Sequence, residues 1–215
     1  AALFFLESAS ANKANWPRFR GPDGAGVAAD QAVPVSLNET NRVWSVPLSG
    51  PGSSSPVVWG EKVFVTSENR ARGLVQLHCF HVRDGRSLWS KSVNVGAYRT
   101  HKMNNTAAAT PAVTQDLVVF SWYDSGRKVA VLSALTHEGE ERWSYDIGEF
   151  KGAHGLNIVP VIHDGRVFLA HLHQRGGFVV ALDADTGKAA WKRKHESVSQ
   201  EPMRMVAQPG LASTD

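Results

Sequence analysis

The sequence predicts an all-β protein, a partial β-propeller built from four-stranded antiparallel sheets, and two repeating anchors carry this prediction. Tryptophan recurs at intervals of 45, 54 and 48 residues, at Trp44, Trp89, Trp143 and Trp191. Proline recurs at intervals of 55 and 49 residues, at Pro56, Pro111 and Pro160. Two independent anchors that share one period, with no helical periodicity between them, indicate a repeated unit of short strands. Units of four strands and about 50 residues are typical of propeller blades.

The composition is that of a folded globular protein. The 215 residues are 42% hydrophobic and 20% charged, enough for a sizeable core. The formal net charge is +3, and the charged residues are spread along the chain without a basic block. We therefore expect no nucleic-acid partner. The single cysteine, Cys79, cannot form an intramolecular disulfide, and its apolar neighbours predict a buried, unreactive thiol.

The first 41 residues precede the repeats. Residues 1–11 lack an initiator Met and join an apolar run to small residues, which predicts the remnant of a secretory signal peptide. We therefore expect a periplasmic or secreted bacterial protein, and no run is long enough to predict a transmembrane segment. Residues 12–41 are expected to form an irregular arm, pinned by apolar burial of Trp16 and Phe19.

The partial propeller is expected over residues 42–215. Its blades are predicted at about 53–95, 107–148 and 156–195, with the start of another at 199–215. In the third unit the strands are predicted over 158–162, 166–173, 178–182 and 190–194, joined by Asp-Gly, Gly-Gly and Thr-Gly turns. The proline that opens each unit fits a first strand, where its missing N–H costs little of the ladder.

Each of the three units carries a glycine four residues before its tryptophan, namely Gly85, Gly139 and Gly187. We interpret the glycine as a tight hairpin turn and the tryptophan as a wedge against the next blade. Read alone, 181-ALDADTGKAAW-191 could also suggest a calcium loop or a phosphate-binding loop. Neither fits, because no further acid occurs before Glu196 and a strand, not a helix, is predicted after the glycine.

The spacing of Ala181, Asp183, Thr186-Gly187-Lys188 and Trp191 resembles the tryptophan-docking motif of the pyrroloquinoline-quinone-like (PQQ-like) propeller repeat family. Residues 15–26 and 42–67 are also similar to the start of secreted, planctomycete-like bacterial members, related to the propeller lipoprotein of outer-membrane assembly. The resemblance implies about seven or eight blades, which need roughly 350 to 400 residues. We therefore expect this chain to be a fragment.

The longest connections between units, residues 94–110 and 148–157, are expected at one mouth of the propeller channel, where ligands bind. The candidate ligand-binding residues in them are Tyr98, Arg99, His101, Asn104, Asn105, His154 and Asn157. His171 and His173 are candidate metal ligands, because residues two apart on a strand face the same side. Histidines on a propeller surface are usually ordinary polar strand residues, so we predict no metal site from this pair alone. No catalytic residues can be singled out, since the sequence lacks a nucleophile elbow.

Three functions are compatible with these observations. The first is a non-enzymatic scaffold without a cofactor, binding a protein or a small molecule at the propeller face. The second, which the family resemblance implies as the alternative, is a quinoprotein dehydrogenase that oxidises an alcohol or sugar with PQQ and calcium. The third is a hydrolase or lyase with its site in the central loops. We expect the scaffold, because no quinone-stacking tryptophan, calcium ligands or catalytic Asp can be located in the sequence.

Overall fold

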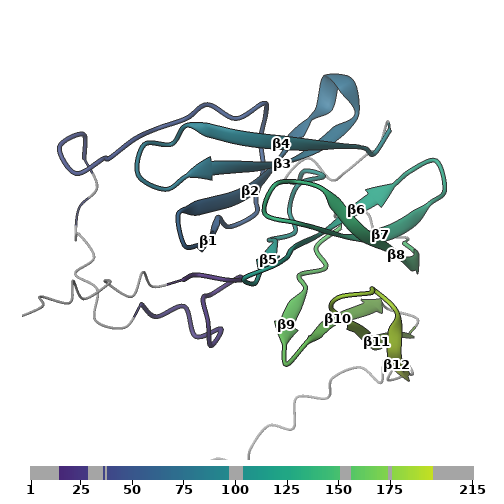
Figure 1. The fold of residues 1–215 in the computed structure, drawn as a ribbon. Helices are drawn as coiled ribbons and strands as arrows, with labels where there is room; N and C mark the ends of the chain where they lie inside the picture. Colours follow the sequence, from purple (N-terminus) through teal and green to yellow (C-terminus); the bar gives the residue numbers. More distant parts are fainter. Residues whose placement is uncertain are drawn as a thin grey trace, which may run out of the picture.

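The computed structural model describes residues 15–28, 36, 38–96, 104–150, 156–173 and 176–195. The expected signal-peptide remnant and the expected unit at 199–215 lie outside these ranges. Within them the chain forms three four-stranded antiparallel sheets arranged as an open arc (Figure 1). The prediction of an all-β protein with four antiparallel strands per unit is confirmed.

Each sheet is formed by strands that are consecutive in the sequence. Sheet 1 consists of β1 (Val57–Trp59), β2 (Lys62–Asn69), β3 (Leu74–His81) and β4 (Ser87–Asn94). Sheet 2 consists of β5 (Ala112–Val113), β6 (Val118–Asp124), β7 (Val129–Leu135) and β8 (Glu141–Glu149). Sheet 3 consists of β9 (Val161–His163), β10 (Arg166–His173), β11 (Gly176–Asp183) and β12 (Ala189–His195). One turn of 3-10 helix, η1 (Arg70–Arg72), is the only helix in the described part of the chain.

The first strand of each sheet lies innermost. β1 contacts β5 and β5 contacts β9, so the three short strands line the inside of the arc (Figure 1). A proline directly precedes each of them, namely Pro56, Pro111 and Pro160. Proline cannot donate a ladder hydrogen bond, so it is tolerated at the beginning of a strand. The outer strands β4, β8 and β12 lie on the outside of the arc.

Sheet 2 packs on both faces, and the alternation of side chains along its strands decides which neighbour each one meets. On β6, Val118 and Phe120 belong to the core shared with sheet 1. Val119, between them, belongs to the core shared with sheet 3. The partners on the two sides include Val57, Phe64 and Leu77 of sheet 1 and Val167, Leu169 and Val180 of sheet 3. The middle sheet is therefore apolar on both faces.

Cys79 is a member of the core between sheets 1 and 2. Its side chain is fully buried and forms no disulfide. Burial in apolar surroundings disfavours the thiolate and raises the pKa of the thiol to about 12. Because the thiolate is the reactive form of cysteine, the predicted buried and unreactive thiol agrees with this environment.

Each sheet carries a β-bulge at the residue before its tryptophan. In sheet 1, Cys79 pairs with Trp89 while Phe80 pairs with Ser87, so Leu88 is the extra residue. The same shift occurs before Trp143 and before Trp191 in the other two sheets. The residue opposite each tryptophan is small and fully buried, namely Cys79, Ala134 and Ala181. Bulges re-aim the side chains next to them, so this recurring irregularity sets the direction of the outer-strand tryptophans.

The N-terminal arm is attached by its backbone. Trp16 and Val58 exchange two backbone hydrogen bonds of 2.9 Å, and the N–H of Val113 donates to Pro17 O at 2.8 Å. The Trp16 ring is half-buried and covers Gly21. Phe19, however, is 45% exposed with Arg20 over its ring, so the prediction that Phe19 pins the arm is wrong. The three main-chain hydrogen bonds to Val58 and Val113 take the place of the apolar contact that we expected from Phe19.

Candidate functional site

The recurring tryptophans contact the turn glycines of the sheet that follows them. A Cβ added to Gly85, Gly139 or Gly187 would lie 2.6 Å, 2.9 Å and 2.6 Å from the rings of Trp44, Trp89 and Trp143, respectively. The three glycines have φ angles of 69°, 86° and 69°, in the left-handed region that favours glycine. Each glycine thus serves its own turn and also makes room for a tryptophan from the preceding unit, a role that the sequence analysis did not assign.

Each of these tryptophans is also fixed by a hydrogen bond. The indole N–H donates to a carbonyl of the same turn, from Trp44 to Val82 O at 2.8 Å, from Trp89 to His137 O at 2.8 Å and from Trp143 to Ala184 O at 2.7 Å. A buried indole needs a partner for its N–H, and the turn supplies it. The contact therefore fixes the orientation of neighbouring sheets as well as their distance.

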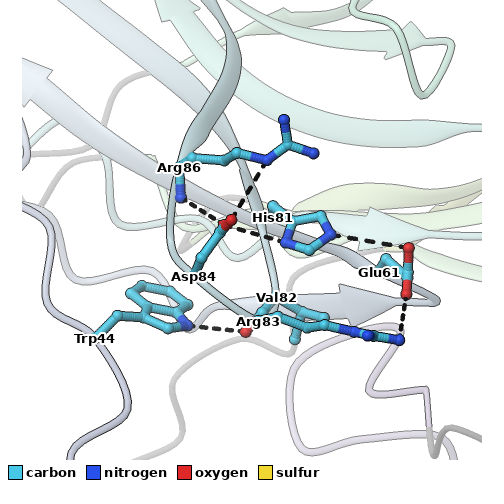
Figure 2. Close-up of polar contacts among 7 residues, drawn as sticks. All are labelled: Trp44, Glu61, His81, Val82, Arg83, Asp84 and Arg86. Atoms are coloured by element: carbon cyan, nitrogen blue, oxygen red, sulfur yellow. Dashed lines mark hydrogen bonds and ion pairs between the residues drawn. The ribbon is translucent and has the colours of Figure 1, made fainter.

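Charged side chains surround the turn between β3 and β4 (Figure 2). His81 lies 3.1 Å from Asp84 Oδ1 on one side and 3.8 Å from Glu61 Oε2 on the other. Glu61 also pairs with Arg83 at 3.0 Å. The backbone N–H of Arg86, together with the charges of His81 and Arg86, holds the pKa of Asp84 below its ordinary value. These pairs face solvent, where each contributes little, so they support the turn and do not form a catalytic set.

A buried carboxylate joins sheet 1 to the connection that leads into sheet 2. Glu68, at the end of β2, is 1% exposed. Its Oε2 accepts hydrogen bonds of 2.8 Å from both the N–H and the hydroxyl of Thr106, and its Oε1 forms an ion pair with Arg70 at 2.8 Å. A buried charge is tolerated when it is paired and hydrogen-bonded. Here Oε2 is hydrogen-bonded twice, whereas Oε1 is held only by its ion pair with Arg70. Glu68 is thus committed to holding this connection in place.

The predicted loop residues divide into two groups. Tyr98, Arg99, His101 and His154 lie outside the described residues. Asn105 is buried beside Thr106, where its Nδ2 donates to Ser53 Oγ at 2.7 Å and its Oδ1 accepts from Ala107 N at 3.0 Å. Asn104 precedes it in the same connection, and Asn157 is exposed before β9. The structure therefore places Asn105 beside the contact between Glu68 and Thr106, which we call the Glu68 junction. Asn157 is not part of this contact.

Sequence reasoning missed the junction, although the segment 50–54 contained a signal for it. A Cβ on Gly50 would lie 2.1 Å from Glu68 O, and one on Gly52 would lie 2.5 Å from Thr66 O. Only glycine permits such a close approach to the backbone of β2. Two glycines before a run of serines therefore marked a segment that packs against a strand. Glu68, an acid just after the apolar run 62–66, was the second signal.

His171 is buried and connects sheets 2 and 3. Its Nε2 is hydrogen-bonded to Glu149 O at 3.0 Å, and its ring lies 5.3 Å from that of Phe178. The side chain of the other candidate metal ligand, His173, is outside the described part of the structure. Among the described residues, no three His, Cys, Asp or Glu side chains gather as a metal site would require.

The outer face of sheet 1, the one turned away from sheet 2, combines buried apolar side chains such as Phe80 with a chain of hydrogen-bonded polar groups, and the preceding segment of the chain covers it. Ser49 Oγ lies 2.8 Å from Ser67 Oγ, which is hydrogen-bonded at 2.9 Å to Nε2 of His78. Nδ1 of His78 is in turn hydrogen-bonded to Ser90 Oγ at 2.9 Å. Burial lowers the pKa of His78 below its ordinary value. Trp44 lies over the turn of the same sheet, so residues 44–49 cover its outer face.

The outer face of sheet 3, turned away from sheet 2, is apolar and open. Leu172 is 53% exposed and Trp191 is 42% exposed, and the ring of Trp191 lies 6.2 Å from that of Phe168. All seven residues of β12 are exposed. No glycine among the described residues covers Trp191 in the way that Gly187 covers Trp143. Large exposed apolar side chains of this kind are typical of a surface that takes part in binding.

Comparison with known proteins gives one family and several similar folds. The family model described as "Outer membrane protein assembly factor BamB" matches residues 25–204. The quinohemoprotein alcohol dehydrogenase from Comamonas testosteroni has a similar structure, with a TM-score of 0.58 and 18% identity over 87% of this chain. Two further structures match with lower TM-scores. BamB from Moraxella catarrhalis reaches 0.43 at 16% identity over 73% of this chain, and a europium-containing methanol dehydrogenase reaches 0.47 at 14% over 65%.

These matches differ in what they show. The chain spans 28%, 56% and 24% of the alcohol dehydrogenase, the BamB structure and the methanol dehydrogenase, respectively. At 18% identity, the match to the alcohol dehydrogenase shows a shared fold and nothing about activity. No curated protein sequence matches the chain.

Proposed function

The chain belongs to the family described as outer membrane protein assembly factor BamB, and on this premise we propose that it is a propeller scaffold that binds other proteins. The name of that family concerns the assembly of outer membrane proteins. We extend it to this chain as a proposal, with an unfolded or extended polypeptide as the partner. The chain spans only 28% of the similar alcohol dehydrogenase structure, so the activity of the whole protein belongs to the same proposal.

The observation that carries the proposal is the way in which the buried polar side chains are used. Glu68 is bonded to Thr106 and paired with Arg70, and Asn105 is bonded to Ser53 and Ala107. These groups hold one segment of the chain against another. A catalytic group must instead point at a substrate and keep hydrogen-bonding capacity for it. The described polar residues therefore support a rigid framework rather than a reaction.

The exposed surfaces support the same proposal. Protein-binding surfaces are enriched in aromatic side chains that remain accessible in the free protein. Trp191 and Leu172 provide such a surface on sheet 3. The outer strand β12 adds backbone groups that no other described strand pairs with. An extended polypeptide could use both, the apolar face for its side chains and the strand edge for its backbone.

The proposal includes a location and the absence of a cofactor. We place the protein in the periplasm or outside the cell, in keeping with the family description and the signal-like residues 1–11. No helix in the described ranges has the length and apolarity needed to cross a bilayer. The scaffold needs neither PQQ nor calcium, whereas the alternative dehydrogenase needs both.

Two measurements on the full-length protein separate these functions. The first mixes it with a urea-unfolded outer-membrane β-barrel protein and, separately, with an unfolded soluble protein of equal length. The scaffold should bind the barrel chain after dilution and delay its aggregation, with little effect on the soluble chain. The second titrates PQQ with calcium and follows absorbance and dye reduction by an alcohol. Dye reduction without binding of the barrel chain would overturn the scaffold proposal.

A further inference from the structure

The outer strands of the three sheets differ sharply in charge. β12 carries Lys192, Arg193 and Lys194 in succession and no acid. β8 carries three acids and one arginine, and Lys91 is the only charged residue of β4. Among the three outer strands, β12 is therefore the one that carries a run of positive charge.

β12 is also accessible and unpaired along one edge. β11 is the only strand in the described part of the chain that pairs with it. All seven of its residues are exposed, whereas β4 also has partly buried positions and β8 has both partly and fully buried ones. Within the described residues, Lys192, Arg193 and Lys194 form no ion pair. Elsewhere Lys62, Arg127 and Arg166 are paired with acids of the protein itself.

The side chains of β12 alternate between the two faces of sheet 3. Lys192 lies over the ring of Phe178 at 3.6 Å, on the side that faces sheet 2. Trp191 lies near Phe168 on the open side, and Arg193 shares this side because it is two residues further on. The side chains of a strand added along the edge of β12 would thus meet Lys192 on the face toward sheet 2. On the open face they would meet Arg193 and the ring of Trp191.

We propose that β12 binds an acidic extended polypeptide segment, which adds to sheet 3 as a fifth, antiparallel strand. Lysine and arginine on an edge strand repel neutral apolar or basic strands, which protects the edge against aggregation. The same cations attract a strand that carries acids at the opposite positions. In strand addition the main chain supplies affinity and the side chains supply selectivity. This inference rests on the proposed scaffold function and specifies the chemistry of its partner.

The pairing geometry defines the sequence of the partner. The bound segment runs antiparallel to β12. From its N- to its C-terminus, its residues therefore lie opposite Lys194, Arg193, Lys192 and Trp191 in turn. Opposite charges and aromatic contacts are the favourable cross-strand pairs. The segment should therefore read as three acids followed by an aromatic residue, flanked by residues with high strand propensity.

The test is a binding titration with a labelled synthetic peptide, Thr-Val-Glu-Asp-Glu-Tyr-Val-Thr, followed by fluorescence anisotropy. Three control ligands define the mode of binding. One has Gln and Asn in place of the acids, one has N-methylated backbone amides along the binding edge, and one is a single-stranded oligonucleotide of similar charge. Strand addition requires both acids and free backbone N–H groups, so the first two peptides should bind at least about tenfold more weakly.

Variants of the protein locate the site. The combined Lys192→Glu, Arg193→Glu and Lys194→Glu variant should weaken binding of the acidic peptide by about tenfold or more. A variant with Gln at the same three positions should show a smaller loss, and it replaces the first if the reversed charges impair folding. The matched control changes three exposed or partly exposed cations outside β12, Arg72, Lys91 and Arg142, to Glu. It alters net charge equally and should retain the affinity of the unmodified protein.

The possible results either support or overturn the inference. Equal binding of the N-methylated peptide or of the oligonucleotide would overturn it in favour of general attraction of polyanions. Equal losses in the two triple-Glu variants would do the same. Self-association that requires β12 and the acidic β8 of a second copy, without peptide binding, would replace the partner by the protein itself. If the β12 variants still bind the unfolded barrel chain normally, the scaffold proposal stands and only the strand-addition inference fails.

Discussion

Sheets 1 and 3 border the same middle sheet, yet their outer faces are built in opposite ways. Sheet 1 turns serines, His78 and the buried Phe80 outward, and residues 44–49 cover this face with hydrogen bonds and with the ring of Trp44. Sheet 3 turns Phe168, Leu172 and Trp191 outward, and no described segment covers them. The outer face of sheet 1 is thus covered by its own chain, whereas the outer face of sheet 3 is open among the described residues.

The difference should be largest for the tryptophans themselves. Trp143 is 8% exposed between sheets 2 and 3, whereas Trp191 is 42% exposed. Replacing a buried aromatic by alanine costs about 3–5 kcal/mol, so Trp143→Ala should lower the free energy of unfolding by that amount. Trp191→Ala should cost about 1 kcal/mol or less, because its ring loses little burial. Urea unfolding of both variants measures the two losses. Equal losses would mean that sheet 3 is covered in solution.

The second test asks whether the turn glycines serve the tryptophans or only their own turns. Gly85 and Gly165 have similar φ angles of 69° and 65°, but only Gly85 has a tryptophan where a Cβ would lie. Gly165→Ala should cost about 1–2 kcal/mol, from the left-handed backbone alone. Gly85→Ala should cost about 2–4 kcal/mol, because the methyl group also displaces Trp44. Thermal unfolding compares them, and equal costs would contradict a steric role for Gly85.

The covered face of sheet 1 should respond to pH through His78. Its pKa is lowered in the folded state, so the unfolded chain binds a proton first as the pH falls below about 6.5. Stability is therefore fully present above that pH and decreases as the pH falls toward the folded-state pKa, by at most about 1.4 kcal/mol per pH unit. His78→Asn should remove this part of the slope. Unfolding free energies at several pH values provide the measurement, and an unchanged slope in the variant would exclude His78 as its source.

The smallest effect on stability is expected on the open face of sheet 3. Leu172→Lys should change the free energy of unfolding by about 0.5 kcal/mol or less, because the side chain already faces solvent. It should also lower the binding of an apolar dye such as ANS. Leu169, on the same strand but 2% exposed, is the matched position. Leu169→Ala should cost about 2–5 kcal/mol. A large loss in Leu172→Lys would mean that a partner covers this face.

Much of the fold could be read from the repeat because it follows from local chemistry. Proline can only begin a strand, glycine readily adopts a left-handed turn, and alternating apolar residues form strands between them. The prediction for 166–173 coincides with β10, Arg166–His173.

The candidate site was harder to predict. Asn105 was selected as a ligand-binding loop residue, yet it is buried and bonded to Ser53. Its partner lies 52 positions away, and nothing in the local sequence reveals such a contact.

The sequence by itself determined the number of strands per unit, the turns and the residues that recur, because these depend on backbone preferences and on periods within a few residues. Only the tertiary structure decided which glycine receives which tryptophan. The period places Gly85 beside Trp89, whereas packing places it under Trp44, because the outer strand of one unit leans on the turn of the next. Tertiary structure also decided that one outer face is covered and the other open, since burial depends on neighbours far apart in the chain.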